Sequence, residues 1–221
     1  MKLKSVLTMT YLISLIFLFS NCSFTSKTEP KITNKQIINK QMSEKTDTAI
    51  FGAGCFWCVE AIFQRLKGVE SIESGYTGGT VENPTYKQVC TGETGHAEVT
   101  KIIFNPDVIS FNDLLEVFWT THDPTTLNQQ GADIGTQYRS AVFYLNDEQK
   151  MQAEKSKSEI ATQIWDGTIV TEITPLKKYY KAEDYHQNYF NQNSDQSYCR
   201  FVINPKLEKF RKKFKDKIKD E

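Results

Sequence analysis

The chain has 221 residues, enough for one domain with a sizeable core between short terminal segments. Lys plus Arg and Asp plus Glu both number 27, and residues 1–47 hold seven Lys and three acids, which leaves 20 basic against 24 acidic residues. This mildly acidic balance argues against nucleic acid as the main partner. Five cysteines at irregular spacing are too few for a disulfide scaffold.

The first 21 residues predict a signal peptide. Lys2 and Lys4 precede an apolar run over 6–19, which is too short to span a bilayer comfortably. Cys22 follows directly, as in bacterial lipoprotein signals, which are cleaved before a cysteine that becomes lipidated. We therefore expect a membrane-anchored lipoprotein of the cell envelope, on its periplasmic or extracytoplasmic face. An ordinary secretory signal and a retained anchor are the alternatives.

Residues 22–47 predict a flexible tether, because they are rich in Ser, Thr, Lys and Asn and almost without aromatic residues. Met42 could start a shorter, soluble cytoplasmic form. The domain proper is expected over residues 48–205.

The segment around Gly54 predicts a reactive cysteine. A short buried strand over 48–51 precedes it, and apolar residues from Val59 to Leu66 recur at helical spacing. Cys55 is therefore expected at the start of a helix, where backbone amides and the helix dipole favour a thiolate. Cys58 lies one turn later, within disulfide reach.

Two other interpretations of this cysteine pair remain open. Both thiols could be structural and simply buried in the core. A zinc half-site has little support, because no second Cys-x-x-Cys follows and the three histidines are scattered, at His96, His122 and His186.

The elements that follow predict an α+β fold. Strands are expected over 69–76, 96–104, 138–145 and 168–173, and helices over 86–90, 111–121 (capped by Ser110), 146–164 and 183–190, with a long polar loop over 122–135. Strand–helix–strand occurring twice is the split βαβ arrangement of ferredoxin-like folds, here with additional helices and long loops.

The tail over 206–221 predicts an amphipathic helix. Leu207, Phe210, Phe214 and Ile218 follow at spacings of 3, 4 and 4, and eight Lys and Arg residues decorate the rest. Packing on the domain is the simpler interpretation, and contact with a membrane surface is the alternative.

Three further side chains are candidates for chemistry. Glu98 lies in a strand otherwise spaced for a buried face, where a carboxyl has a raised pKa and can donate a proton. Tyr86 and Tyr138 each follow a loop that could place a phenol at a site. Taken singly, each tyrosine is more simply explained by packing.

Seven motifs occur in order along the chain. They are Gly-Cys-Phe-Trp-Cys-Val-Glu (54–60), Gly-Tyr-Thr-Gly-Gly (75–79), Asn-Pro-Thr-Tyr (83–86), Thr-Gly-His-Ala-Glu (94–98), His-Asp-Pro-Thr-Thr (122–126), Gly-Thr-Gln-Tyr-Arg-Ser (135–140) and Tyr-Tyr-Lys-Ala-Glu-Asp-Tyr-His-Gln-Asn-Tyr (179–189). The series resembles the A-type peptide methionine sulfoxide reductases over about residues 48–205.

The resemblance implies a reaction, the thiol-dependent reduction of methionine S-sulfoxide, free or in peptides, as repair of oxidised proteins. It implies roles for seven residues: Cys55 as nucleophile, Glu98 as proton donor, Tyr86 and Tyr138 as phenols on the sulfoxide oxygen, Asp133 ordering the site, and Phe56 and Trp57 as walls around the S-methyl group.

A sulfenic acid on Cys55 would then condense with a second thiol. Cys58 is the expected first resolver, Cys199 the alternative or a later relay, and Cys90 is interpreted as structural. A thioredoxin-like dithiol is the expected reductant, with no metal, flavin or nucleotide cofactor. We expect a monomer.

Two rival functions remain open. A thioredoxin-like dithiol oxidoreductase would need a cis-proline loop facing the cysteine pair, and Pro84, Pro106 and Pro124 lie in turns that fit other roles. A redox-inert lipoprotein that only binds a ligand would not explain an activated cysteine at the start of a helix.

Overall fold

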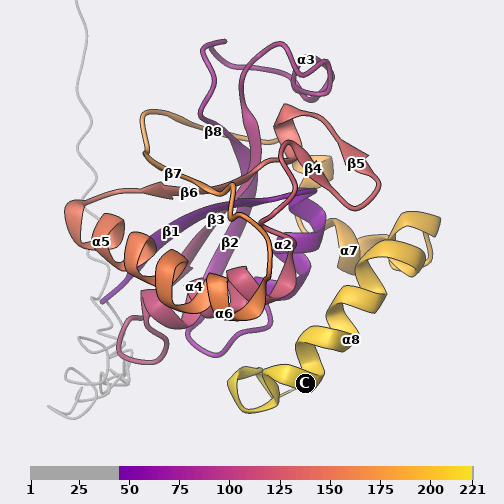
Figure 1. Cartoon of the computed structure of the whole chain (residues 1–221). Coiled ribbons are helices and arrows are strands. Elements are labelled where there is room, and N and C mark those ends of the chain that lie inside the picture. Colours follow the sequence, from indigo (N-terminus) through magenta and orange to yellow (C-terminus); the bar gives the residue numbers. More distant parts are fainter. Residues whose placement is uncertain (1–44, 221) are drawn as a thin grey trace, which may run out of the picture.

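Six strands form one mixed sheet at the centre of the structure, a computed structural model in which residues 45–220 are described (Figure 1). In spatial order they are β7 (Glu172–Pro175), β6 (Ser140–Tyr144), β1 (Asp47–Ala53), β3 (Ala97–Phe104), β2 (Val69–Thr77) and β8 (Tyr179–Lys181). The predicted signal peptide, the lipidated Cys22, the start at Met42 and most of the tether lie outside the described residues.

The inner four strands and two helices form the predicted ferredoxin-like core. Helix α2 (Phe56–Phe63) connects β1 to β2, and α4 (Phe111–Thr121) connects β3 to β6. The strand order β6-β1-β3-β2 is antiparallel throughout. The α+β fold class and the split βαβ arrangement are therefore confirmed.

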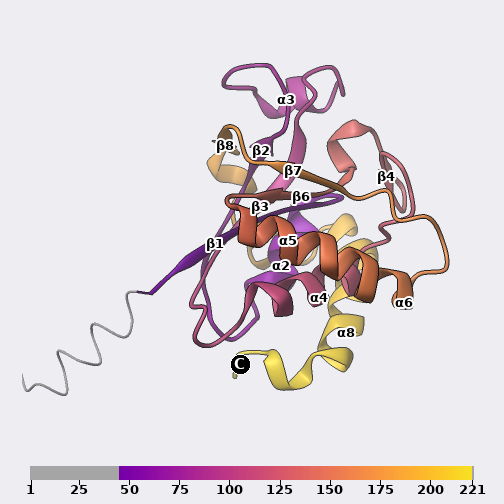
Figure 2. The ribbon, with the colours of Figure 1, turned by 60° about the vertical axis from the view of Figure 1, so that its left-hand side comes forward.

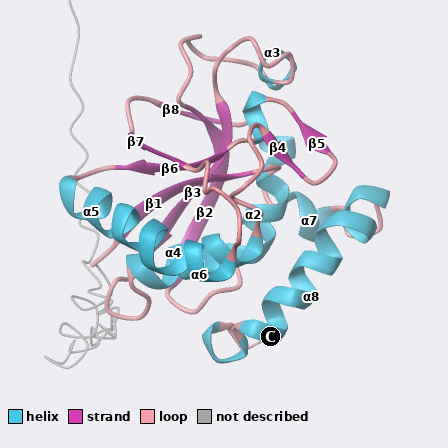
Figure 3. Cartoon of the chain, viewed as in Figure 1, coloured by secondary structure: helices cyan, strands magenta, loops and turns pink. Residues whose placement is uncertain are grey.

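The two faces of the sheet are covered differently, as the alternation along β1 shows. The ring centroid of Phe51 lies 5.7 Å from that of Phe63 on α2 and 5.0 Å from that of Phe118 on α4, so this face carries the main core. The neighbouring Ile50 points to the other face, where a smaller cluster is packed by Leu176 and Tyr179. Figure 3 shows the long helices α4 and α5 together in front of the sheet.

The second half of the chain follows the prediction with shifted boundaries. Helix α5 (Asp147–Ser156), a π-helical turn over Lys157–Ala161 and α6 (Thr162–Ile164) together fill the predicted 146–164 helix. The strand expected over 168–173 is wrong in position, because the Val170 amide donates to the Pro124 carbonyl and pairing with β6 begins only at Glu172. The edge strand β8 was not predicted.

The long loop over 122–135 contains structure of its own. Its strands β4 (Gln129–Gln130) and β5 (Asp133–Ile134) form a short hairpin. A 3-10 turn over Thr136–Tyr138 follows, so the strand expected from 138 begins only at Ser140.

The C-terminal tail packs on the domain. A π-helical segment over Cys199–Ile203 leads into α8 (Asn204–Lys213), and a 3-10 turn over Lys215–Lys217 follows. The predicted unbroken helix over 206–221 is therefore wrong beyond Lys213. Leu207, Phe210 and Phe214 are buried as their spacing predicted, and among residues 45–220 no helix is long and apolar enough to cross a membrane.

Candidate active site

Cys55 lies at the turn between β1 and α2, as the sequence predicted. It is the N-cap residue of α2, and its carbonyl accepts a hydrogen bond of 3.0 Å from the Cys58 amide. Gly54 has φ 85°, and a Cβ atom there would lie 2.6 Å from side-chain carbons of Gln130. Only glycine fits this turn, because the backbone is left-handed and the β4 hairpin packs directly against it.

The two thiols form one buried pair, with Cys55 6% and Cys58 2% exposed. Burial raises the pKa of the Cys55 thiol, which also hydrogen-bonds Cys58. This hydrogen bond lowers the pKa of Cys58 to about 7, with a further contribution from the positive charge of Lys206. Desolvation therefore opposes the helix dipole at Cys55, and the expectation that Cys55 is the thiolate stays a prediction.

Glu98 faces the start of α2 from the middle of the sheet. Its side chain is 1% exposed, and its Oε2 accepts a hydrogen bond of 3.0 Å from the Phe56 amide. Burial raises the pKa of Glu98 to about 8, even though this hydrogen bond favours the carboxylate. A carboxyl that is protonated at neutral pH therefore lies beside the residue that follows Cys55.

Tyr86 and Tyr138 reach the same region from two loops. Tyr86 begins helix α3 (Tyr86–Val89), and its ring stacks on Phe56 with centroids 6.5 Å apart. Tyr138 ends the 3-10 turn before β6. Burial raises the pKa of both phenols, and the charge of Glu98 raises both further. Both hydroxyls thus remain protonated donors near the acid.

Asp133 lies close to the thiol pair through a residue that sequence reasoning missed. The Tyr198 hydroxyl donates to Asp133 Oδ2 at 2.7 Å and lies 3.8 Å from Cys58 Sγ. The one sequence signal that could have indicated Tyr198 is its position directly before Cys199, and this signal is weak. The tyrosine is a bridge between the β4–β5 hairpin and the cysteines.

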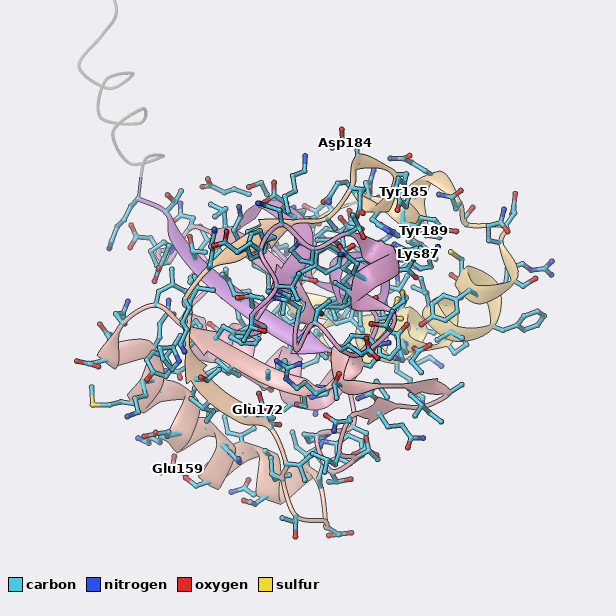
Figure 4. All side chains as sticks on the ribbon, turned by 90° about the horizontal axis from the view of Figure 1, so that it is seen from above. Lys87, Glu159, Glu172, Asp184, Tyr185 and Tyr189 are labelled. Atoms are coloured by element: carbon cyan, nitrogen blue, oxygen red, sulfur yellow. The ribbon has the colours of Figure 1, made fainter. Side chains whose placement is uncertain are left out.

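Phe56 and Trp57 belong to a larger aromatic wall. Trp57 stacks on Tyr189 with centroids 3.7 Å apart and an angle of 7° between the rings. The His186 ring lies 5.1 Å from Phe56 and 4.3 Å from Tyr86. His186 and Tyr189 were noticed in sequence only as part of the last motif. Seen from above, Tyr185, Tyr189 and Lys87 lie on one side of the molecule and Glu159 and Glu172 on the other (Figure 4).

A buried carboxylate holds this wall in place. The Oε1 and Oε2 atoms of Glu60, on α2, accept hydrogen bonds from the Asn188 and Tyr189 amides at 2.8 and 3.3 Å. Asn188 has φ 52°, so the helix expected over 183–190 is wrong: it is split into a 3-10 turn (Asp184–His186) and α7 (Tyr189–Gln192). The tertiary contact with Glu60 explains this break.

Glu183 holds the other side of the wall. It accepts hydrogen bonds of 2.9 Å from the Tyr76 hydroxyl and from the Tyr86 amide. These bonds outweigh burial and keep the pKa of Glu183 below its usual range. The Glu183 carboxylate therefore joins α3 to the motif over 179–189. Sequence reasoning did not predict this role for Glu183.

The other two described cysteines differ from each other. Cys199 is fully buried in the π-helical segment, which packs on α2, and burial raises its pKa. Cys90 is exposed at the end of α3 with its sulfur against the Tyr86 phenol, and its interpretation as structural stays a prediction. All four described cysteines are free thiols. In residues 45–220, no cluster of three or more His, Cys, Asp or Glu could hold a metal ion.

A buried thiol pair at a helix start, faced by a protonated carboxyl and phenols, defines the site of a thiol-dependent oxidoreductase. Residues 47–218 match the family model described as peptide methionine sulfoxide reductase. The chain therefore belongs to the peptide methionine sulfoxide reductase family, and it is an enzyme of that activity.

Individual relatives agree with the family match. Peptide methionine sulfoxide reductase MsrA of Deinococcus radiodurans is 48% identical over 200 residues, which cover 90% of this chain and 94% of that protein. The Pasteurella multocida MsrA is 54% identical over 171 residues, 77% of this chain and 98% of that protein. The crystal structure of reduced Mxr1 from Saccharomyces cerevisiae aligns with a TM-score of 0.67 at 36% identity, covering 70% of this chain and 90% of that one.

Proposed function

We propose that Cys55 is the nucleophile and Glu98 the proton donor in reduction of methionine S-sulfoxide. The observation that carries this proposal is the hydrogen bond from the Phe56 amide to Glu98 Oε2, 3.0 Å, which holds a carboxyl with a pKa of about 8 at the start of the helix that Cys55 caps. A negative Glu98 would disfavour the Cys55 thiolate, so the reactive state pairs a thiolate with a protonated acid.

The reaction then follows from these protonation states. The Cys55 thiolate attacks the sulfoxide sulfur while Glu98 gives a proton to the sulfoxide oxygen, assisted by hydrogen bonds from Tyr86 and Tyr138. The attack joins Cys55 Sγ to the methionine sulfur. The protonated oxygen then bonds to Cys55 Sγ while its bond to the methionine sulfur and the new S–S bond break, so that methionine leaves with the sulfur electron pair and Cys55 becomes a sulfenic acid. Methionine sulfoxide is reduced and the cysteine is oxidised by two electrons.

A second thiol closes the cycle. The Cys58 thiolate, whose pKa is about 7, attacks the sulfenic sulfur and displaces water, which gives a Cys55–Cys58 disulfide. Cys199 packs against the same helix and is the candidate for a later relay. A thioredoxin-like dithiol restores both thiols, and no prosthetic cofactor takes part.

The aromatic wall suits the substrate. Phe56 and Trp57 present apolar surface for the S-methyl group, and the site accepts both the free amino acid and oxidised protein segments. The preference for the S epimer belongs to this proposal.

Turnover assays test the assignment. The fragment 42–221, with Cys55→Ser and Cys58→Ser variants, is assayed with free and peptide-bound methionine S- and R-sulfoxide and dithiothreitol. Loss of turnover in Cys55→Ser with retention in Cys58→Ser supports the roles, because dithiothreitol reduces the sulfenic acid directly. Equal loss in both variants contradicts the division of roles, and turnover of the R epimer alone contradicts the substrate.

We further propose that the chain is exported and held in the cell envelope by a lipid on Cys22, where it repairs oxidised envelope proteins. The support is the charged, apolar and cysteine-ended leader of the sequence. Palmitate labelling of the wild-type chain and its loss in Cys22→Ala would support the anchor. An unchanged membrane fraction in Cys22→Ala would contradict it.

A further inference from the structure

A group of basic residues lies at one end of the domain and is unrelated to the thiol site. We call it the basic end cluster: Lys67, Arg211, Lys212, Lys215 and Lys219. These side chains line a hollow of ≈ 650 Å³ together with Asp216, Ile218 and Asp220. Five positive charges thus face two negative ones.

Within the described residues, Arg211 pairs with Glu208 at 3.6 Å, whereas no lysine of the cluster pairs with a carboxylate. Lys67 and Lys219 donate to backbone carbonyls, of Asp216 at 3.2 Å and of Gln64 at 2.8 Å, which leaves both charges in place. Lys212 and Lys215 are exposed, and within the described part of the chain neither has a carboxylate partner.

The chain enters the domain at the same end. The start of β1, Asp47, pairs with Phe104, and the next residue, Asn105, donates to the Gly68 carbonyl at 2.8 Å. The adjacent Lys67 amide donates to the Lys217 carbonyl at 2.8 Å. Figure 2 shows the start of β1 and the C-terminus at the lower end, with α3 at the top.

Cys55 follows the opposite end of β1. Seven residues of strand separate the two ends, a distance of roughly 20 Å at 3.3 Å per residue. The end where the chain enters and the end that carries the thiols are therefore opposite edges of the sheet along the strand direction.

We infer that the basic end cluster binds the anionic headgroups of a phospholipid bilayer and turns the thiol site away from the membrane. Exposed, unpaired lysines around an open hollow match a layer of negative charge. The 44 residues that precede the described part include the apolar run over 6–19, so a membrane-held N-terminus keeps this end nearest to the bilayer. The physiological setting rests on the proposed export and anchor, whereas the surface itself can be tested without them.

Vesicle sedimentation of the fragment 42–221 tests the surface. The aligned segment makes up 98% of the Pasteurella multocida relative, so this domain is essentially a whole protein there and the leader can be omitted. Vesicles of phosphatidylcholine alone are compared with vesicles containing phosphatidylglycerol, at low and high salt. The variant Lys212→Glu/Lys215→Glu is compared with Lys155→Glu/Lys177→Glu, which makes the same charge change at exposed positions elsewhere.

We expect binding to the anionic vesicles only, weakened by salt. Each basic residue near such a surface contributes about fivefold to partition, so the double reversal should lower partition at least about 25-fold. The control variant should keep it within about threefold. The inference would be overturned by equal binding to neutral vesicles. It would also be overturned by no binding at low salt or by equal loss of binding in both variants, and either of these results would point to another acidic partner.

Turnover in the same samples separates the surface from the chemistry. The Lys212→Glu/Lys215→Glu fragment should reduce a soluble oxidised peptide at the wild-type rate. Vesicle-bound wild-type fragment should also retain its turnover, because the thiol site faces the solvent. Loss of turnover on binding would overturn the orientation, whereas absence of turnover without vesicles would count against the proposed reaction only.

Discussion

The ionisable groups at the two ends of β1 differ in their exposure to water. At the end that carries Cys55, ionisable groups are removed from water: Glu98 is 1% exposed, and burial is the first cause of its raised pKa. At the other end, Lys45 and Asp107 pair at 2.9 Å with side chains 66% and 58% exposed. Desolvation creates the reactive protonation states at the first end, whereas water and salt screen each charge at the second.

This contrast predicts where single substitutions matter most. Loss of a buried ionisable group near the thiols should change rate or stability by factors of ten or more. Loss of one exposed charge should change neither rate nor stability. At the basic end cluster, only the change of several charges together should have a measurable effect, on membrane binding.

The largest effect is expected for Glu98→Gln. The amide keeps the shape of the side chain and can still accept from the Phe56 amide, but it cannot give a proton to the sulfoxide oxygen. We expect kcat/KM to fall at least about 100-fold. The matched control is Glu73→Gln on the neighbouring strand, outside the site, and activity of Glu98→Gln within threefold of that control would refute the role of the acid.

The next effect is on the aromatic wall. Glu60→Ala leaves the Asn188 and Tyr189 amides without their buried acceptor and should lower the free energy of unfolding by about 3 kcal/mol. Glu60→Gln keeps an acceptor oxygen and should cost clearly less. Denaturant unfolding measures both, and equal losses would contradict a contribution from the one hydrogen bond that the Gln oxygen can still accept.

The sequence predicted those features that depend on neighbours in the chain. Ser110 caps a helix over Phe111–Thr121 with the expected boundaries, because its side chain and that of Asp113 form a capping box. The turn before Cys55 and the buried setting of Glu98 were visible in local spacing and glycine placement.

Features set by contacts distant in sequence were not predictable in this way. Asn188 adopts a left-handed conformation in a segment held by Glu60, 128 positions earlier, and Tyr198 reaches Asp133 across 65 positions. The lowered pKa of Cys58 likewise depends on the hydrogen bond from its partner thiol and on the charge of Lys206, which lies 148 positions away, and burial opposes it. No periodicity records such contacts.

A smaller effect concerns stability and pH. The pKa of Glu98 is about 8 in the folded protein and near the ordinary glutamate value when unfolded, so the folded state holds a proton that the unfolded state loses. Its contribution to stability is complete below about pH 4 and is lost as the pH rises through 8. The free energy of unfolding of Glu98→Gln minus that of wild type should therefore be at least about 1 kcal/mol larger at pH 9 than at pH 4. Thermal unfolding at both pH values measures this, and a constant difference would contradict the buried-acid assignment.

Tyr198→Phe should have a modest effect on the thiols. Its hydroxyl lies 3.8 Å from Cys58 Sγ and helps to keep the pKa of both cysteines down, so its removal should raise the pKa of the pair. Turnover with a thioredoxin-like reductant should fall about threefold to tenfold at neutral pH and recover at alkaline pH. Ultraviolet thiolate absorbance follows the titration directly. An unchanged thiol titration with slower turnover would mean that Tyr198 acts only through Asp133.

The smallest effect is expected for Lys45→Ala at the opposite end. Its pair with Asp107 is exposed on both sides, so solvent screening and side-chain entropy offset the attraction. The free energy of unfolding should stay within about 0.5 kcal/mol of wild type, and turnover should not change. A loss comparable to that of Glu60→Ala would mean that the start of β1 is held by this pair. The contrast between a desolvated and a solvated end of the same strand would then fail on stability while still holding for the chemistry.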